Sequence, residues 1–581
     1  MAGKITQHRA SPMSDATGAS VDSSPNDSPS SNLPPAKNSA FAPLKEKVFR
    51  RIWTASVLSN FGQLILGVGV AWEMTRLTDS STMVALVQTA MMLPLMLVAL
   101  PAGAIADMFD RRKVAMSGLC IAIVFSSTLS VLAYLGLTTP WVLLAFCSLI
   151  GTGVAFYYPA WNSSIGEQVT QAALPAAIAL NSISYNVARS FGPAVGGLIV
   201  LALGAQAAFA VNAIAYLPLL LALFVWQRVQ VSSRLPPERI SRAIVSGMRY
   251  ALHSSPIRTV LIRVCIFTFG SATANALAPL IAKDLLHGDA GTFGILLGAT
   301  GVGAVLGALL ISRIHETFTL EQAVSFLAVT GGLSFFALAL SHNLIVSCLA
   351  MMLAGAMSMV TISLMNITVQ ISVPRWVIAR ALSLYSSLLT AGVAVGAWFW
   401  GSVADHWSIE ISLLASGAFL LLLPLLAFVL PMPNYDLTSA EQADFHSEPE
   451  VNLPVTMRSG PIVIEIEYQV EEVNAREYYD AMQAVRKLRM RNGGFDWTIT
   501  RDIADPELWI ERFHLPTWGD YLRMRDRLTQ ADMAAMGEAD KHLKHGAKKH
   551  VRRGLERPLG SVRWKTTTPD NRQDNSVFMG P

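Results

Sequence analysis

Long apolar runs dominate the middle of this chain and recur with short polar breaks between them. Each run is close to the roughly 20 residues that an α-helix needs to cross a bilayer. The runs fall into two groups of six and predict twelve membrane-spanning helices. The expected spans are 52–75, 82–105, 114–135, 140–162, 174–201, 205–226, 260–282, 291–312, 320–341, 343–367, 376–402 and 408–430.

Polar or alternating segments flank this apolar region. Residues 1–42 are rich in Ser, Pro, Ala, Asn and Asp, which predicts a disordered tail. After an expected linker at 432–459, residues 462–468 alternate between apolar and polar as a strand does. Further patterns follow in β-α-β-β-α order, which predicts a ferredoxin-like cytoplasmic domain at 460–545 and a basic flexible tail at 546–581.

The predicted fold class is an all-α membrane protein of two six-helix halves with a small α+β C-terminal domain. The halves are expected at 45–226 and 257–431, joined by a cytoplasmic connector at 227–256. They also echo each other weakly, because a pair of glycines in the fifth run recurs in the eleventh: Gly192 and Gly197, then Gly396 and Gly401. Repeated halves are typical of secondary transporters.

Composition agrees with a membrane protein. Of the 581 residues, 52% are hydrophobic and 14% are charged, whereas soluble proteins carry about 25% charged residues. The four cysteines lie in apolar runs at spacings that suggest neither a disulfide framework nor a metal site. No phosphate-binding loop occurs, so an ATP-driven pump is not implied. We expect no cofactor and no nucleic acid partner.

The placement of basic residues predicts the orientation of the helices. Bases precede the first span, follow the second and fill the central connector, whereas the alternate loops offer little beyond Arg76 and Lys283. Loops on the cytoplasmic side of a membrane carry the excess of Lys and Arg. Both termini are therefore expected in the cytoplasm.

One charged turn between the second and third spans carries a recognisable motif. It contains Gly103, Asp107, Asp110, Arg111, Arg112 and Lys113. This spacing resembles the loop between helices 2 and 3 of the major facilitator superfamily, although Met108 and Asp110 depart from its pattern. In that superfamily the loop is implied to latch the two halves together on the cytoplasmic side. A plain topology signal is the alternative.

Residues 45–430 resemble one branch of that superfamily, the transmembrane secretion effectors. The resemblance rests on Phe49-Arg-Arg-Ile-Trp53 and on Asn186-Val-Ala-Arg189-Ser-Phe-Gly192-Pro193-Ala-Val-Gly196-Gly197. The second segment is also similar to the superfamily's antiporter motif. The resemblance implies export of a small organic molecule (a siderophore, drug or secondary metabolite) across the bacterial inner membrane, coupled to protons. Import or facilitated diffusion by the same fold stays open.

Two charged residues within the spans are candidates for binding and coupling. Arg189 lies far from either end of its span, where a charge is costly and usually faces a cavity or a partner. It could bind an anionic substrate, or pair structurally. Glu73 is expected to be the only acid inside the spans and is the candidate for protonation, although an exposed interfacial carboxylate would look the same.

Polar and aromatic residues near the middle of the spans are candidates to line a substrate cavity, since transporter sites lie near the midplane between the halves. For each one an interhelical hydrogen bond is the plainer interpretation. They are Asn60, Gln63, Tyr157, Tyr158, Asn162, Asn181, Tyr185, Asn275, Asn366 and Tyr385.

The C-terminal domain is similar to small antibiotic-biosynthesis monooxygenases, through Glu511-x-Phe513 and Trp518-x-x-Tyr521. A transporter–enzyme fusion, in which this domain binds or modifies the cargo, is therefore an alternative. Candidates for such chemistry are Asn492, Trp497, Trp509 and His514. The main interpretation is a transporter without enzymatic activity, whose partners are the lipid bilayer, a small-molecule substrate and protons. The C-terminal domain could also mediate dimerisation.

Overall fold

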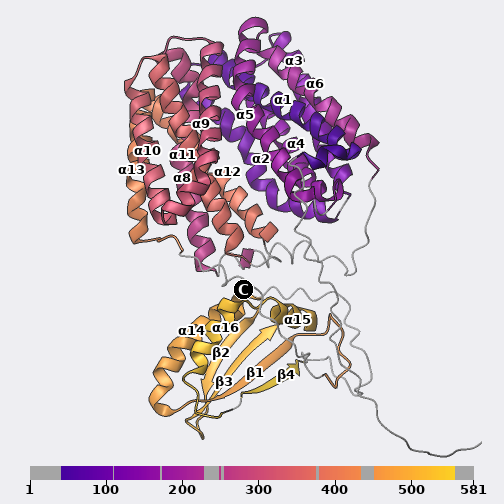
Figure 1. Ribbon diagram of the computed structural model, residues 1–581, viewed down its shortest axis with the longest axis vertical. Coiled ribbons are helices and arrows are strands. Elements are labelled where there is room, and N and C mark those ends of the chain that lie inside the picture. The colour runs from indigo at the N-terminus through magenta and orange to yellow at the C-terminus, as the bar shows by residue number, and fades with distance from the viewer. Residues whose placement is uncertain are drawn as a thin grey trace, which may run out of the picture. The chain divides into compact units, whose positions relative to one another are not determined.

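Twelve helices in the described part of the chain are long and apolar enough to cross a membrane. The computed structural model describes residues 41–108, 110–170, 173–227, 248–249, 254–373, 378–433, 451–547 and 549–556. The expected N-terminal tail, most of the connector, the middle of the linker and the end of the basic tail lie outside these residues. The helical bundle and the C-terminal sheet confirm the predicted fold class (Figure 1).

The first half contains six long helices whose ends are set by local sequence. Asp110 caps the third helix by accepting a hydrogen bond from the Arg112 backbone N–H, and Thr139 caps the fourth. Gly204 has φ of +82° and forms the tight turn between the fifth and sixth. The helices are α1 Lys47–Leu77, α2 Ser81–Met108, α3 Arg111–Tyr134, α4 Pro140–Ser164, α5 Leu174–Leu203 and α6 Ala205–Val225.

The second half repeats this arrangement. Capping boxes begin two of its helices, with Asp289 paired to Thr292 and Thr319 paired to Gln322. Its first helix continues directly into a short π-helix, η4. The elements are α8 Ser255–Leu280, η4 Ile281–Leu285, α9 Ala290–Thr317, α10 Leu320–Leu340, α11 Leu344–Ile371, α12 Ile378–His406, α13 Ile409–Leu422 and the 3₁₀ segment η5 Leu423–Phe428.

The alternating helix directions define two ends of the bundle. One end holds the α1–α2 turn at 78–80, the end of α5, the start of α9 and the end of α12. We call it the Thr78 end. The other holds the α2–α3 turn, the start of α5 and the start of α12, and we call it the Asp110 end.

Two helices, α5 and α12, each connect their own half to the other. In α5, a Cβ on Gly192 would lie 3.0 Å from Leu64 of α1, and one on Gly197 would lie 2.5 Å from the carbonyl oxygen of Ala290 in α9. In α12, the equivalent close approaches run from Gly396 to Phe269 of α8 and from Gly401 to Ala85 of α2. The glycine repeat in the sequence therefore marks two matching seams between the halves, α5–α9 and α2–α12.

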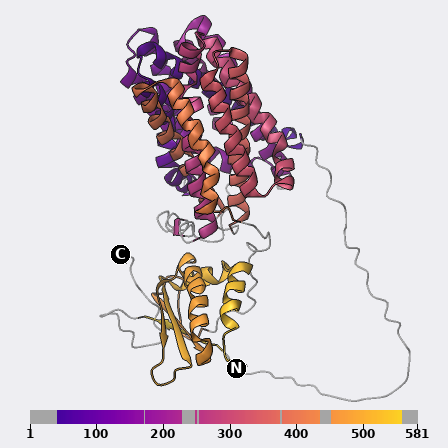
Figure 2. The ribbon, with the colours of Figure 1, turned by 90° about the vertical axis from the view of Figure 1, so that its left-hand side faces the viewer.

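The C-terminal part forms a four-stranded antiparallel sheet in the order β2-β3-β1-β4. Alternate residues of the central strand β1 are buried, and Figure 2 shows the helices of this part on one face of the sheet. The elements are β1 Ile462–Gln469, α14 Ala475–Arg491, β2 Phe495–Arg501, β3 Leu508–Leu515, α15 Trp518–Asp526, α16 Gln530–Asp540 and β4 His550–Leu555.

The position of β4 corrects one expectation. It lies inside the stretch predicted to be a basic flexible tail, so the predicted end of the domain at residue 545 is too early. The strand carries only Val551 and Leu555 as large apolar residues among histidine and arginines. This pattern looked like a charged tail because β4 is an edge strand that needs few apolar contacts. It pairs with β1 from Glu467↔His550 to Ile462↔Leu555.

Candidate functional site

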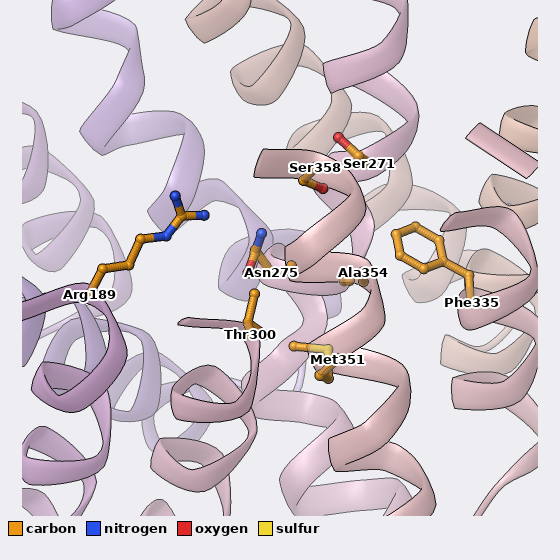
Figure 3. A pocket seen from close by; sticks show the side chains of 10 residues that line it. Arg189, Ser271, Asn275, Thr300, Phe335, Met351, Ala354 and Ser358 are labelled. Carbon is orange, nitrogen blue, oxygen red and sulfur yellow. The ribbon is translucent and has the colours of Figure 1, made fainter. Parts of the chain in front are cut away.

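A small cavity lies among α8, α9, α10 and α11 of the second half, and Arg189 of α5 reaches it from the first half. Figure 3 shows Arg189 extending from α5 toward Asn275 of α8 and Thr300 of α9, with Phe335 on the far side. The cavity measures about 10 Å³, which is room for roughly one water molecule. Its lining residues are Arg189, Ser271, Ala274, Asn275, Thr300, Phe335, Met351, Ala354, Gly355 and Ser358.

The position of Arg189 follows from close backbone packing. A Cβ on Gly301 would lie 2.5 Å from the Arg189 carbonyl oxygen and 2.6 Å from Ser190 Cα, so only glycine permits this approach. The contact fixes the Arg189 backbone against α9, and its side chain points into the cavity. Within the described residues, the guanidinium has no hydrogen bond or ion pair to another side chain.

Several predicted cavity residues gather on the Asp110 side of Arg189. Asn181, Tyr185 and Arg189 are spaced four residues apart along α5 and therefore share one face of the helix. Asn181 donates a hydrogen bond of 3.5 Å to Asn162 of α4, and Tyr158 of α4 interacts with both Tyr185 and Asn162. Tyr158 and Tyr185 are both exposed. The structure thus brings Tyr158, Asn162, Asn181 and Tyr185 together in one polar and aromatic group.

The other predicted cavity residues lie elsewhere. Asn60 donates to Ser184 within the first half at 3.0 Å, and Asn366 accepts from Gln370 within α11. Tyr157 is buried against Trp161, and the buried Tyr385 hydroxyl donates to the Ile362 carbonyl oxygen at 2.7 Å. Gln63 is half-buried on α1.

The two halves are held together at the Thr78 end by polar contacts. The Asp405 carboxylate, at the end of α12, accepts hydrogen bonds from Ser80 Oγ at 3.1 Å, Ser81 N at 2.8 Å and Thr82 Oγ1 at 3.0 Å. Asp405 therefore caps the N-terminus of α2 from the opposite half. Nearer the middle of the same seam, Thr89 Oγ1 donates to the Ala394 carbonyl oxygen at 2.7 Å.

A second set of contacts closes the Thr78 end around α1. Lys283 Nζ, on η4, donates to the Thr75 carbonyl oxygen at 2.8 Å. The Trp72 ring of α1 stacks on Phe293 of α9, with 6.2 Å between centroids. These contacts join the halves beside the Asp405 cap, so the Thr78 end is closed by groups from α1, α2, α9, α12 and η4.

Glu73 lies at this closed end and not at the cavity. Its carboxylate is buried and pairs with Arg76 at 3.3 Å, one turn along α1. Gly192 of α5 packs against Leu64, and Glu73 lies roughly two and a half turns, or about 13 Å, further along α1. The structure therefore keeps Glu73 apart from Arg189.

Two contacts of the predicted latch loop lie within the first half. Arg111 pairs with Glu167 after α4 at 3.1 Å, and Arg112 donates to the Phe224 carbonyl oxygen at the end of α6. Asp110 caps α3, and Lys113 is exposed. Gly103 and Asp107 belong to the last turns of α2, whose side chains lie outside the described part of the chain.

The antiporter-like motif forms the α5 side of the seam with α9. A Cβ on Gly294 would lie 2.8 Å from the Pro193 carbonyl oxygen, and one on Gly196 would lie 3.1 Å from Ile65 Cα of α1. Pro193 stands inside α5 and removes one backbone donor from the helix. The motif therefore packs α5 tightly against both α1 and α9 in this closed arrangement.

An ion pair of the second half, with a buried arginine and a partly exposed glutamate, was not predicted. Arg263 of α8 is 4% exposed and lies 2.7 Å from Glu321 in the first turn of α10. Glu321 also accepts a hydrogen bond of 2.8 Å from the Met432 backbone N–H. The expectation that Glu73 is the only acid within the spans is therefore wrong. Glu321 lies two residues after the helix-capping Thr319, where an acidic residue is usually exposed at a helix N-terminus.

One of the four candidates for chemistry in the C-terminal domain, Trp497, contacts a buried carboxylate. Glu511 accepts hydrogen bonds from Arg489 at 3.1 and 3.3 Å, from Tyr468 at 2.8 Å and from Trp497 at 2.9 Å. Burial would raise the pKa of Glu511, but the Arg489 guanidinium and these donors together hold that pKa below its ordinary value. Trp497 therefore uses its indole N–H for a structural hydrogen bond in this network.

The other three candidates do not join that network. Asn492 donates to the Leu488 carbonyl oxygen at the end of α14, and Trp509 stacks edge-on against Tyr478. His514 Nε2 lies 3.7 Å from Glu556. The four candidates therefore do not form one site.

Comparison with known proteins gives consistent matches. The model of the transmembrane secretion effector family matches residues 38–559. The chain is 25% identical to the multidrug efflux pump Tap of Mycolicibacterium fortuitum over 66% of this chain and 96% of that protein. It is 25% identical to the enterobactin exporter EntS of Escherichia coli O1:K1, over 65% and 90%. A staphyloferrin A transporter of Staphylococcus aureus is 21% identical, over 53% and 77%.

Solved structures share the fold of the helical bundle. A bacterial homologue of the human lysosomal transporter Spinster, in an inward-facing and unoccupied conformation, aligns with a TM-score of 0.55 at 14% identity. That match covers 67% of this chain and 97% of the other. The nucleoside transporter NupG, as its D323A mutant, aligns at 0.54 and 12% identity, over 66% and 99%.

Proposed function

Because this chain belongs to the transmembrane secretion effector family of major facilitator transporters, we propose that it exports a small organic molecule by alternating access. The membrane is the bacterial cytoplasmic membrane in this proposal. The observation that carries it is the cavity at Arg189, where this side chain of the first half meets a wall formed by the second half, beneath a closed Thr78 end. A site between repeated halves is where alternating access exposes a substrate to each side in turn.

We propose that the Asp110 end faces the cytoplasm. The α2–α3 turn there carries Arg111, Arg112 and Lys113, whereas at the Thr78 end the described bases on the chain's surface are few. With the Thr78 end closed, the substrate then reaches Arg189 from the cytoplasm, past Tyr185 and Asn181. This is the state from which an exporter loads. The efflux functions of Tap and EntS support the same direction.

The family resemblance supports a latch role for Asp107 at the cytoplasmic end. It follows Gly103 by one turn and precedes the basic cluster, so its carboxylate can form charge-assisted bonds in one state of the transporter only. Asp107→Asn should leave protein abundance near normal and cut transport severely. Normal transport by this variant would reduce the loop to a topology signal.

Proton antiport is the coupling that we propose, with Glu73 as the titrating group. Glu73 is buried beside the contacts that close the Thr78 end, so a change in its charge would act directly on those contacts. Its partner Arg76 is exposed and lies in the same turn region. Release of the proton on one side and uptake on the other would then be linked to opening of this end.

The test is accumulation of a panel of siderophores and drugs in cells that lack or overproduce the protein. Export predicts lower accumulation on overproduction, reversed by an uncoupler. Proteoliposomes with an imposed pH difference then separate antiport from facilitated diffusion. Accumulation that rises with overproduction would contradict export and favour import by the same fold.

A further inference from the structure

We propose that Arg189 forms an anion-binding subsite, and that the transported molecule is an organic anion whose carboxylate or similar oxyanion pairs with this guanidinium. The inference rests on the proposed function, since it concerns the same cavity. It adds the chemical class of the substrate.

The first argument is the missing counter-charge. A guanidinium near the middle of a membrane is costly unless it is paired or hydrated. Within the described residues, Arg189 has neither an ion pair nor a hydrogen bond, and the cavity wall contributes no carboxylate. Glu73 pairs with Arg76 instead, and Glu321 pairs with Arg263. An anionic ligand would supply the charge that the protein does not.

The second argument is the chemistry of the cavity wall opposite Arg189. Asn275 brings an amide toward the guanidinium and Ser358 adds a hydroxyl, whereas the hydroxyls of Thr300 and Ser271 donate to the carbonyl oxygens of Leu296 and Thr268 (Figure 3). An Arg side chain offers planar, bidentate donors to a carboxylate, and neutral hydroxyl and amide donors can complete its hydrogen bonding. This wall suits an oxyanion and contains no acidic side chain that could pair with a cation.

The third argument concerns size and direction. The cavity has room for about one water molecule, so it can receive only the charged end of a substrate. Met351 lies in the wall, and its flexible side chain can move to widen the space for two oxygens. The rest of the molecule would lie along α5 toward the Asp110 end, where Tyr185 and Asn181 provide an aromatic ring and an amide. The substrate expected from this path is an aromatic or hydroxylated organic acid.

The experiment uses benzoate and benzamide, which share size and ring but differ in charge. Binding to the purified full chain in lipid nanodiscs is measured by calorimetry in a zwitterionic buffer. Wild-type protein should bind benzoate at least tenfold more tightly than benzamide. Arg189→Gln should remove that preference, and Arg189→Lys should retain part of it. Arg313→Gln is the matched control, since it removes an exposed cation near the end of α9, outside the cavity, and should leave the preference unchanged.

Two further arms make the result decisive. Retained benzamide binding and an unchanged thermal midpoint show that Arg189→Gln is folded. Titration with chloride distinguishes an organic-acid subsite, where chloride competes weakly, from a site for inorganic anions, where it displaces benzoate at equal concentration. Absent benzoate binding, equal binding of both probes by wild-type protein, a preference that survives Arg189→Gln, or displacement by equal chloride would each overturn the proposal. Binding needs no transport, so these outcomes are independent of whether export itself is observed.

Discussion

The Asp405 cap should control how often the transporter opens at the Thr78 end. Asp405→Asn keeps the size of the side chain but removes the charge that accepts three hydrogen bonds from Ser80, Ser81 and Thr82. A hydrogen bond to a charged group contributes about 1.5–3 kcal/mol, against about 0.5–1.5 for a neutral one. The charge at a helix N-terminus adds about 0.3–1 kcal/mol.

Asp405 is exposed, so solvent screens these interactions and the lower part of each range applies. We expect the closed Thr78 end to lose about 1–2 kcal/mol, which raises the open population roughly 5–30-fold. Because the bonds join α12 to α2 across the seam, the loss falls on the closed state and not on the folding of either half.

The assay is labelling of a cavity cysteine from outside the cell. Ser271→Cys places the reporter in the cavity, in a chain whose native cysteines at 120, 147, 265 and 348 are replaced. The rate of reaction with a membrane-impermeant maleimide should rise 5–30-fold in Asp405→Asn. Glu410→Gln is the matched control, because it removes an acid from the first turn of α13 at the same end. Equal rates in wild type and Asp405→Asn would refute the cap as a closing contact.

Three other substitutions test separate parts of the molecule. Gly301→Val should abolish transport, because a Cβ at this position would lie only 2.5 Å from the Arg189 carbonyl oxygen and would push α9 away from α5. The control Gly67→Ala, which has open space around it, should transport normally. Transport by Gly301→Val would contradict the close packing of this seam. Glu73→Gln should abolish uphill efflux but retain substrate binding, and efflux against a gradient by this variant would exclude Glu73 as the coupling group. Glu511→Gln should destabilise the C-terminal domain at pH 7 by about 3–5 kcal/mol, since it leaves Arg489 buried without a counter-charge. Because the pKa of Glu511 is lowered in the fold, its stabilisation is present above an unfolded pKa of about 4.3 and is lost as the pH falls below it. The measurement is amide hydrogen exchange of the β1 peptide, corrected for the intrinsic exchange rate. Its protection should fall at acid pH in the wild type and much less in Glu511→Gln. An equal fall in both proteins would contradict the stabilising role of the Glu511 carboxylate.

The twelve membrane-spanning helices could be predicted from the sequence, because the bilayer imposes the same requirement on each of them. Each span must be apolar over its whole length, so the twelve helices can be read from hydropathy with ends shifted by only a few residues. The glycine pairs could be predicted as a repeat because both halves use them for the same close packing. The α+β domain follows from strand alternation in the same way.

The missed features are pairings between distant segments. Nothing near Asp405 in the chain indicates that it caps α2, because the two residues that meet, Ser81 and Asp405, are brought together only by the packing of the halves. Arg263 and Glu321 each look like an ordinary charge at a helix end until α8 and α10 lie side by side. The place of Arg189 at a cavity could be predicted, because its depth in the span is a local property.

The sheet order has a consequence for synthesis of the protein. β1 is made first, yet one of its two neighbours, β4, is the last strand of the sheet to leave the ribosome. At about 5–20 residues per second, several seconds pass while one edge of β1 has no partner. An unpaired edge can pair with another chain, and nascent chains on one polysome are crowded at the membrane. A tag or stop codon placed before His550 would make that exposure permanent, so any shortened version should be cut after Leu555.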